Sequence, residues 1–301
     1  MHAGPSGHDA GETGQTTETM NVDIAIAQID AKLGDLKANR ESHLASIDRA
    51  IKQGARLILF PELSLTGYTL RDLAWEVALN PSDPFFRPFL QRSKSITIVL
   101  GFVESAPDHG IYNAALVMED GEVKDCTRKI YPPTYGMFEE GRYFSMGQRV
   151  AAFDSKHGRF GVLICEDLWH PSLPYLLSLD GAEAILTLTA SPTRMADNMK
   201  ELQTAAVNHE HLKAYARLLS SYILFCNRVG FEDGVNFWGG SAVAGPGGDL
   251  IARSPYFEED LLFTHLDSHA VQRARRFSRH FLDENIDLVQ RTLQRISAKR
   301  S

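Results

Sequence analysis

The chain has 301 residues, of which 44% are hydrophobic and 23% are charged. This composition is typical of a globular domain that buries a core without metal or disulfide staples. Its 31 Lys and Arg stand against 38 Asp and Glu, and the net charge of −7 argues against nucleic acid as the main partner. No apolar run approaches the roughly 20 residues of a membrane span, so we expect no membrane contact. Only Cys126, Cys165 and Cys226 carry thiols, which excludes a disulfide framework and favours a reducing, cytoplasmic setting.

Residues 1–20 are rich in Gly, Thr, Ser and acids, and they lack the positive start and apolar stretch of a signal peptide. We expect a disordered tail here. From residue 21 onward, short apolar runs typical of buried strands alternate with helical stretches. These runs span residues 22–29, 57–60, 96–102, 159–165, 184–190, 222–230 and 261–266.

Other patterns predict a helix and two hairpins between these runs. Leu44, Ile47 and Ile51 recur at helical spacing, and a glycine follows them as a stop. An Asp-Gly pair at 120–121 and a Pro-Gly-Gly turn at 246–248 each join two short strands. Roughly ten strands are many for one open sheet. We therefore expect an α/β domain over residues 21–268, with two mixed sheets packed face to face and helices outside them.

The last segment, residues 269–301, has a different character. From residue 270 onward it carries eight Lys or Arg against three acids. Its apolar residues recur at spacings of four, three, four and three, namely Leu282, Ile286, Val289, Leu293 and Ile296. This pattern predicts one amphipathic helix with a basic face, used for packing or subunit contact. Binding to nucleic acid or a membrane surface is the alternative.

Three polar side chains follow apolar runs and could carry chemistry. Cys165 ends the run GVLIC, and the carboxyl end of a central strand is where α/β sheets bind ligands. A thiol needs a base or a positive neighbour to react at neutral pH. Glu62 follows LILF-Pro61, where an unpaired buried carboxylate would be costly, and Lys129 closes the strand after the first hairpin. Each also has an ordinary interpretation, as a small buried hydrophobe, a helix cap or a solvated lysine.

The phrases FPELSLTGY, RKIYPPTYGMFEEGRYFSMG and GVLICEDLW occur in this order, and Glu62, Lys129 and Cys165 are separated by 67 and 36 positions. This set resembles the nitrilase superfamily of carbon–nitrogen hydrolases, and within it the glutamine amidohydrolase domains of glutamine-dependent NAD synthetases. The resemblance implies a four-layer α-β-β-α sandwich that doubles through a dimer interface. It also implies a catalytic triad, with Cys165 as nucleophile, Glu62 as general base and Lys129 as the stabiliser of the oxyanion.

A second glutamate recurs in the superfamily in the loop after the lysine. Glu140 matches its position better than Glu139, and the resemblance implies that it orients Lys129 or the attacking water. Two carboxylates around one ammonium would keep the lysine charged.

Four residues are candidates for contact with the substrate. The backbone N–H of Glu166 would hold the oxyanion together with the lysine. Tyr135 and Trp169 could wall a pocket, and Ser191 follows a strand end where it could donate a hydrogen bond. Arg142 and Arg194 are weaker candidates for holding a carboxylate.

We expect no metal and no cofactor. The segment His209-Glu210-His211 does not favour a metal site, because residues two apart on a helix point in different directions. A papain-like pairing of the cysteine with His170 or His157 is a further alternative, although neither spacing is typical of one.

No ATP-pyrophosphatase segment of the SGGxDS type occurs in the chain. The sequence-based expectation is therefore a stand-alone amidohydrolase that cleaves a primary amide or an N-carbamoyl compound through a cysteine thioester and releases ammonia. A nitrile hydrolase and a catalytically silent scaffold are the alternatives. The expected partners are a small-molecule amide and further copies of the chain, in a homodimer or a higher even homo-oligomer.

Overall fold

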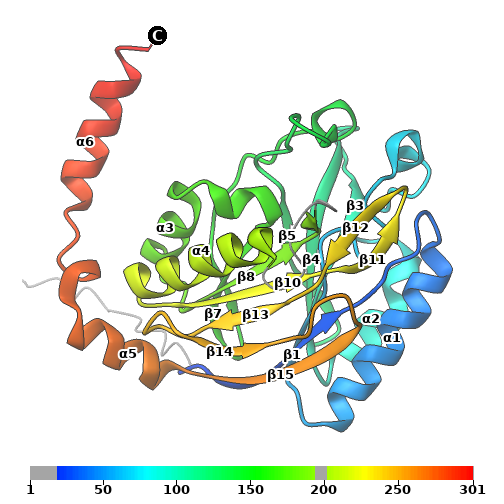
Figure 1. Cartoon of the computed structure of the whole chain (residues 1–301), viewed down its shortest axis with the longest axis horizontal. Helices are drawn as coiled ribbons and strands as arrows, with labels where there is room; N and C mark the ends of the chain where they lie inside the picture. The colour runs from blue at the N-terminus through cyan, green and yellow to red at the C-terminus, as the bar shows by residue number, and fades with distance from the viewer. Residues whose placement is uncertain (1–18, 194–201, 301) are drawn as a thin grey trace, which may run out of the picture.

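Two six-stranded mixed β-sheets face each other, and helices cover the outer face of each (Figure 1). The computed structural model describes residues 19–193 and 202–300. The strand order is β15-β1-β2-β3-β4-β5 in the first sheet and β14-β13-β10-β8-β7-β6 in the second. This arrangement confirms the α-β-β-α sandwich expected from the sequence.

The first sheet forms from the predicted apolar runs and the first hairpin. Its strands are β1 (Asn21–Gln28), β2 (Leu57–Leu59), β3 (Thr97–Ser105), β4 (Ile111–Glu119), β5 (Glu122–Arg128) and β15 (Asp260–Asp267). Strands β1, β2 and β3 are parallel, and the other pairs are antiparallel. Asp120 and Gly121 both have positive φ, as a tight hairpin turn of the primed type requires.

The second sheet has three parallel strands at its centre. Its strands are β6 (Phe153–Ser155), β7 (Gly158–Ile164), β8 (Ala184–Thr189), β10 (Tyr222–Asn227), β13 (Ala242–Ala244) and β14 (Leu250–Arg253). A small third sheet contains β9 (Pro192–Thr193), β11 (Val229–Glu232) and β12 (Val235–Trp238). The sequence did not predict this sheet, since the single run 222–230 is divided between β10 and β11.

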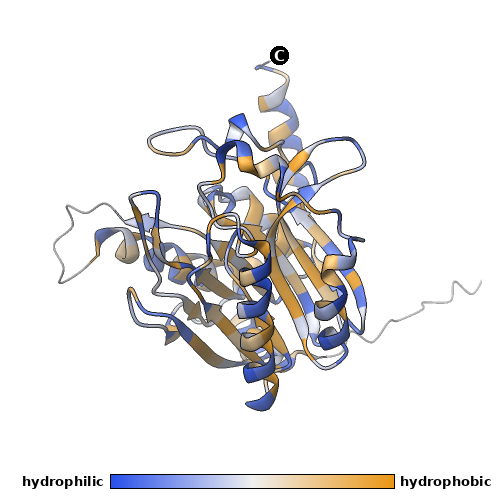
Figure 2. Ribbon diagram, turned by 90° about the vertical axis from the view of Figure 1, so that its right-hand side faces the viewer, coloured by the Kyte–Doolittle hydropathy of each residue, from blue (hydrophilic) through white to orange (hydrophobic). Residues whose placement is uncertain are grey.

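Helices α1 (Leu36–Lys52) and α2 (Arg87–Ser93) cover the first sheet, while α3 (Ser172–Leu179) and α4 (Gln203–Leu219) cover the second. Along β1, Ile24 and Ile26 face the second sheet, and Ala25 and Ala27 face the helices. This alternation places apolar side chains in both layers of the core. Figure 2 shows the strands of the sheets coloured mainly as hydrophobic. Short 3-10 turns occupy the connections, at η1 (Arg71–Trp75), η2 (Pro84–Phe86), η3 (Glu140–Arg142), η4 (Cys165–Trp169) and η5 (Arg279–Phe281).

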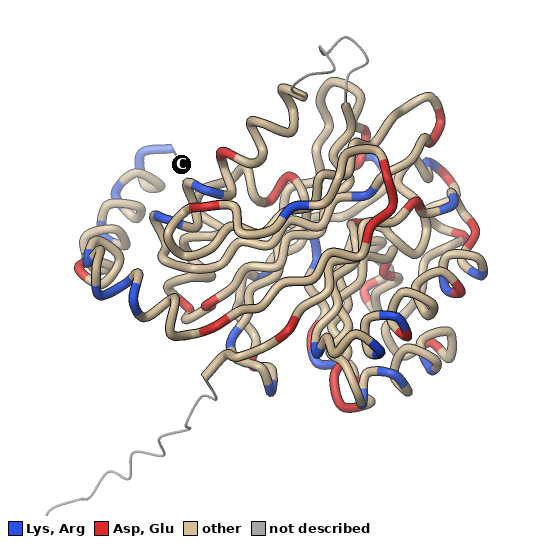
Figure 3. The backbone as a smooth tube through the Cα atoms, turned by 60° about the horizontal axis from the view of Figure 1, so that its bottom comes forward, with Lys and Arg blue, Asp and Glu red and all other residues tan. Residues whose placement is uncertain are grey.

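The C-terminal segment forms two helices, so the prediction of one continuous helix over 269–301 is wrong. Helix α5 (Ser268–Phe277) ends at Ser278, whose backbone is extended, and α6 (Ile286–Ser297) begins after Asn285. The Asn285 side chain accepts a hydrogen bond from the backbone N–H of Leu288, which caps α6. No residue of α6 is buried, and the helix extends away from the sheets (Figure 1). Figure 3 marks the Lys and Arg positions of this segment in blue along the backbone, and the use of the helix in subunit contact stays a prediction.

At the other end, residues 1–18 of the expected tail lie outside the described residues. Met20 is buried between the sheets, and its backbone N–H donates to the Ser268 hydroxyl at 2.7 Å. The ordered domain therefore begins before residue 21. Within the described residues, no helix combines the length and apolar character that a membrane span needs.

Candidate active site

The three predicted catalytic side chains follow strands of both sheets. Glu62 comes three residues after β2, Lys129 directly after β5, and Cys165 directly after β7. The Nζ of Lys129 lies 2.7 Å from Oε1 of Glu62, and both side chains are fully buried. The negative charge of Glu62 and the positive charge of Lys129 both act on the Cys165 thiol. Two sheets thus bring together residues that are distant in sequence.

Lys129 lies between two carboxylates. Its Nζ is also 2.7 Å from Oε1 of Glu140, which is buried, whereas Glu139 pairs with Arg142 at the surface. Burial lowers the pKa of Lys129, but the charges of Glu140 and Glu62 outweigh this effect and hold the pKa well above its usual value. Burial raises the pKa of Glu140, against the opposing effect of the lysine. The lysine is therefore a fixed cation at neutral pH.

Further hydrogen bonds hold Glu62 in place. Oε1 accepts from Nδ2 of Asn113 at 2.8 Å, and Oε2 accepts from the backbone N–H of Ala190 at 2.9 Å. Nδ2 of Asn113 also lies 3.3 Å from Oε2 of Glu140, so this amide ties the two carboxylates together. Asn113 was not predicted as a site residue. The available signal was its position at the start of the apolar run NAALVM, where a buried amide needs a hydrogen-bond partner.

Cys165 lies at a sharp change of chain direction. It is the first residue of η4, directly after β7, and its φ of 49° is left-handed, which is strained for a residue with a side chain. Burial raises the pKa of the thiol well above its usual value, Glu62 raises it further, and Lys129 opposes both. At neutral pH the sulfur therefore carries its proton and needs a nearby base to become a nucleophile.

Asp167 connects the segments that carry the lysine and the cysteine. Its carboxyl accepts backbone N–H groups from Ile130 at 3.1 Å, Tyr131 at 2.9 Å and Ile164 at 3.3 Å. Burial raises its pKa to about 7, although Lys129 and these N–H groups lower it. Asp167 lies within the phrase GVLICEDLW but was not predicted as a site residue.

Tyr68 completes the cluster and was also missed. Its hydroxyl donates to Oε1 of Glu140 at 2.5 Å, which is the same oxygen that Lys129 contacts. Burial raises the pKa of Tyr68 well above 10, and the charges of Glu140 and Glu62 add to the effect. The phenol is therefore a permanent hydrogen-bond donor to the second carboxylate.

The family model for carbon-nitrogen hydrolases matches residues 23–276. The chain belongs to the carbon–nitrogen hydrolase family. This membership confirms the predicted resemblance to the nitrilase superfamily.

Three similar proteins show which members of this family the chain resembles. The chain is 34% identical to the glutamine-dependent NAD(+) synthetase of Acinetobacter baylyi over 244 residues, which are 81% of this chain and 44% of that protein. It matches the ADP complex of the glutamine-dependent NAD+ synthetase from Acinetobacter baumannii with a TM-score of 0.74 and 33% identity, over 83% of this chain and 46% of that one. A carbon-nitrogen hydrolase from Helicobacter pylori G27 shares the fold, with a TM-score of 0.78 at 21% identity, over 91% and 99% of the two chains.

These comparisons correct the predicted function. The expectation of a stand-alone amidohydrolase for amides or carbamoyl compounds is wrong, because the curated relatives are glutamine-dependent NAD(+) synthetases. The chain spans somewhat less than half the length of these relatives. The prediction failed because a triad specifies cleavage of a carbon–nitrogen bond and says nothing of how the released nitrogen is used.

Of the four residues predicted to contact the substrate, two line a cavity beside the site and two contact other side chains of the fold. Tyr135 donates from its hydroxyl to Oε2 of Glu166 at 2.9 Å, and both line an open cavity of about 720 Å³ beside the site. Trp169 is half exposed and packs edge-on against the ring of His211. The Ser191 hydroxyl accepts from the indole N–H of Trp238 at 3.1 Å, so it already has a partner within the fold.

Of the two weaker candidates, the structure describes one. Arg142 forms its ion pair with Glu139 at the surface. Arg194 lies outside the described residues.

The four histidines considered from the sequence take no part in the cluster. On α4, the His209 ring contacts the carbonyl oxygen of Gly240, while His211 packs against Trp169. His157 lies beyond the other end of β7 from Cys165, and the His170 ring stacks on Tyr131 at 3.5 Å between ring centroids. Over residues 19–193 and 202–300, no group of His, Cys, Asp and Glu could hold a metal ion.

Proposed function

We propose that this chain hydrolyses the side-chain amide of glutamine through Cys165, Glu62 and Lys129, and that the ammonia released supplies an NAD+-forming synthetase. The relatives support the substrate and the fate of the nitrogen, since the names of the curated matches specify glutamine dependence and NAD+ synthesis. The site supports the chemistry, because a protonated thiol lies beside a buried carboxylate and a buried ammonium.

In the first step, Glu62 takes the proton of the Cys165 thiol while the sulfur forms a bond to the amide carbon. The π electrons of the carbonyl move to its oxygen. The Lys129 ammonium and the backbone N–H of Glu166 stabilise this oxyanion. Because Lys129 is held by Glu62 and Glu140, it needs no reorganisation when the charge develops.

In the second step, the protonated Glu62 returns its proton to the leaving nitrogen, and the carbon–nitrogen bond breaks to give ammonia and a glutamyl thioester. Water then loses a proton to Glu62 and attacks the thioester carbon. Collapse of this intermediate releases glutamate and restores the thiol. One carboxylate thus serves as base and acid in both half-reactions.

The observation that carries the proposal is the buried cluster of one lysine and two glutamates beside the thiol. The test is release of ammonia from L-glutamine, D-glutamine, L-asparagine and simple aliphatic amides. We expect L-glutamine to have the highest kcat/KM, Cys165→Ser to abolish the release, and Cys126→Ser to leave it unchanged. Equal rates for all the amides would contradict the substrate, and an active Cys165→Ser variant would contradict the nucleophile.

The coupling to synthesis requires a separate measurement. We expect the protein and L-glutamine together to replace ammonium salt in NAD+ formation by an ammonia-dependent synthetase. Glutamine hydrolysis without NAD+ formation at matched ammonia flux would contradict this part of the proposal. An even homo-oligomer also stays a proposal, and light scattering of the purified chain tests it.

A further inference from the structure

A buried arginine outside the triad has no part in the mechanism above. Arg228 lies between β10 and β11, and only 1% of its side chain is exposed. Its guanidinium is 2.6 Å from Oε2 of Glu232 and 3.3 Å from Oδ1 of Asp30, and it lies 4.3 Å from the centroid of the Phe237 ring. Burying a charged group costs free energy, so the contacts that this guanidinium makes indicate what its position serves.

Glu232 connects this arginine to the turn that carries Tyr68. Its Oε1 accepts the backbone N–H groups of Tyr68 at 2.9 Å and Thr69 at 2.5 Å. The residue before them, Gly67, has a φ of 79°, and a Cβ there would lie 2.6 Å from Oε2 of Glu232. Only glycine allows the turn to approach the carboxylate so closely.

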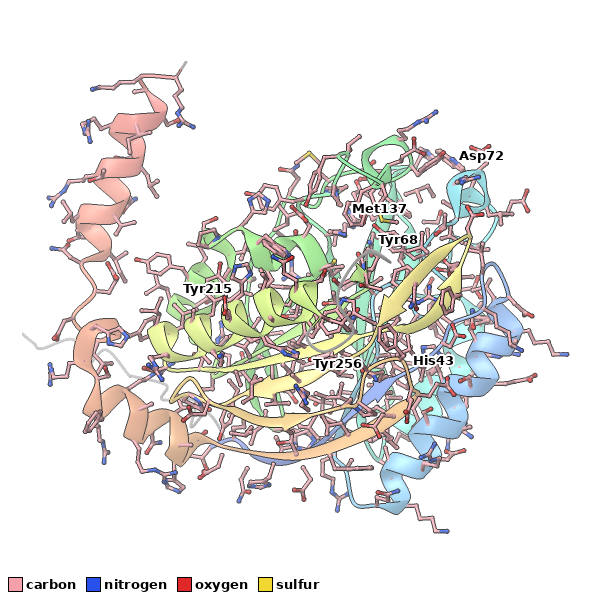
Figure 4. The ribbon with its side chains drawn as sticks, viewed as in Figure 1. His43, Tyr68, Asp72, Met137, Tyr215 and Tyr256 are labelled. Carbon is pink, nitrogen blue, oxygen red and sulfur yellow. The ribbon has the colours of Figure 1, made fainter. Side chains whose placement is uncertain are left out.

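A second route runs from Arg228 to the ring of Tyr68. Phe237, under the guanidinium, packs edge-on against Tyr68 with 5.9 Å between the ring centroids. Figure 4 shows Tyr68 close to Met137, and both line a small cavity of about 190 Å³ that also reaches Glu140. The backbone and the ring of Tyr68 are therefore both held by groups that Arg228 contacts.

We propose that Arg228 and Glu232 are positioning residues, which hold the Tyr68 hydroxyl on Glu140 and so keep Glu140 ionised beside Lys129. The inference rests on the proposed function, since it takes the pair of Glu140 and Lys129 as part of the catalytic machinery.

The groups that face Glu140 are Lys129, Glu62, Tyr68, Asn113 and the Cys165 thiol. Burial and the charge of Glu62 favour the protonated form of Glu140, while Lys129 and the Tyr68 hydroxyl favour the ionised form. Without the hydroxyl, Glu140 takes up a proton at higher pH, and Lys129 then pairs with Glu62 alone. The ammonium then has one carboxylate to hold it in place instead of two, so it is less well positioned for the developing oxyanion.

The test measures the titration of Glu140 in the full chain, labelled with ¹³C at the side-chain carboxyl of glutamate. The resonance that is lost in Glu140→Gln identifies the group. We expect Tyr68→Phe and Glu232→Gln to move its midpoint upward by about one pH unit, since a hydrogen bond to a charged group has about this effect. The double variant should move it no further than Tyr68→Phe alone, because both changes act through the same hydroxyl.

Glu119→Gln is the matched control. Glu119 is another buried glutamate that accepts several hydrogen bonds, from Thr97, Ser155 and Lys156, but it lies at the other end of β4 from Asn113. We expect it to leave the midpoint unchanged. A Glu232→Gln variant that loses thermal stability but titrates like the parent would overturn the proposal, and so would additive shifts in the double variant.

Activity provides the second readout. In Tyr68→Phe and Glu232→Gln, the acid limb of the kcat profile for glutamine should move upward by about one pH unit while KM changes little, so that kcat falls by up to about tenfold on the acid side of the profile and by less at neutral pH. A rise in KM at constant kcat would overturn the positioning role. A parent protein that does not hydrolyse glutamine would contradict the proposed function. The titration of Glu140 needs no substrate, so it would still test the positioning role of Arg228 and Glu232.

Discussion

Replacement of Lys129 by methionine is the most informative perturbation of the buried cluster. The side chain keeps its length, but the Oε1 atoms of Glu62 and Glu140 each lose an ammonium 2.7 Å away. Removing one partner from a buried ion pair costs about 3–5 kcal/mol. A domain of this kind has a free energy of unfolding of about 5–15 kcal/mol, so the loss is a large part of the total.

The cost should depend strongly on pH. In the native protein, burial already raises the pKa of Glu140 against the opposing effect of Lys129, and the substitution removes that opposition. A carboxyl whose pKa is higher in the folded than in the unfolded state contributes stability at low pH, and this contribution is lost as the pH rises through the folded value. Over the pH range in which the folded state holds one proton more than the unfolded state, the free energy of unfolding falls by about 1.4 kcal/mol per pH unit. Relative to the parent, Lys129→Met should therefore be less stable at pH 8 than at pH 5, by up to about 4 kcal/mol.

Urea unfolding at pH 5 and pH 8 measures this difference. The double variant Lys129→Met/Glu140→Gln should recover most of the pH-dependent loss, because one of the two facing carboxylates is gone. Lys156→Met is the control, since Lys156 pairs with Asp120 at the surface and should contribute little. A loss below about 1 kcal/mol, or an equal loss at both pH values, would refute the account of a buried cation that neutralises two acids.

Three further predictions concern other parts of the molecule. Cys165→Ser should abolish glutamine hydrolysis and change the free energy of unfolding by less than about 1 kcal/mol, as measured by ammonia release and urea unfolding, because the two side chains have similar size. Asp167→Asn should flatten the dependence of stability on pH between pH 4 and 8. The pKa of Asp167 is raised from 3.8 to about 7, so the parent loses up to about 4 kcal/mol of stability as the pH rises through this window, and an unchanged slope in the variant would contradict this account. Deletion of residues 286–301 should leave the midpoint of thermal unfolding within about 2 °C, because α6 has no buried residue, and a larger drop would show that the helix packs on the core.

The sandwich was predictable because the central strands of both sheets are nearly all apolar. Runs such as LILF and AILTLTA are buried on both faces, and this leaves little choice of structure. The third sheet was not predictable, since β11 and β12 carry a mixed pattern and β9 has two residues. The C-terminal break was also missed, because the apolar spacing begins only at Leu282 and carries no signal for the extended backbone of Ser278, which follows α5.

The site residues that lie in recognisable sequence motifs were predictable. The contacts between segments that are distant in sequence were not. Glu62, Lys129 and Cys165 lie in motifs that resemble a known family, and the structure places all three together. Tyr68 lies within one of these motifs, but its contact with Glu140 depends on a turn held by a carboxylate 164 residues further along the chain. No local pattern encodes such a contact, because it depends on how the third sheet packs against the loop after β2.

The central claim is that the Cys165 sulfur forms a covalent bond to the glutamine carbonyl carbon. The most direct test is rapid acid quenching of the protein with L-glutamine, followed by mass spectrometry of its peptides. We predict a glutamyl group on the peptide that contains Cys165, formed together with one equivalent of ammonia and absent from Cys165→Ser. Release of ammonia with no acylated peptide at any time, or acylation of Cys126 or Cys226 instead, would contradict the account.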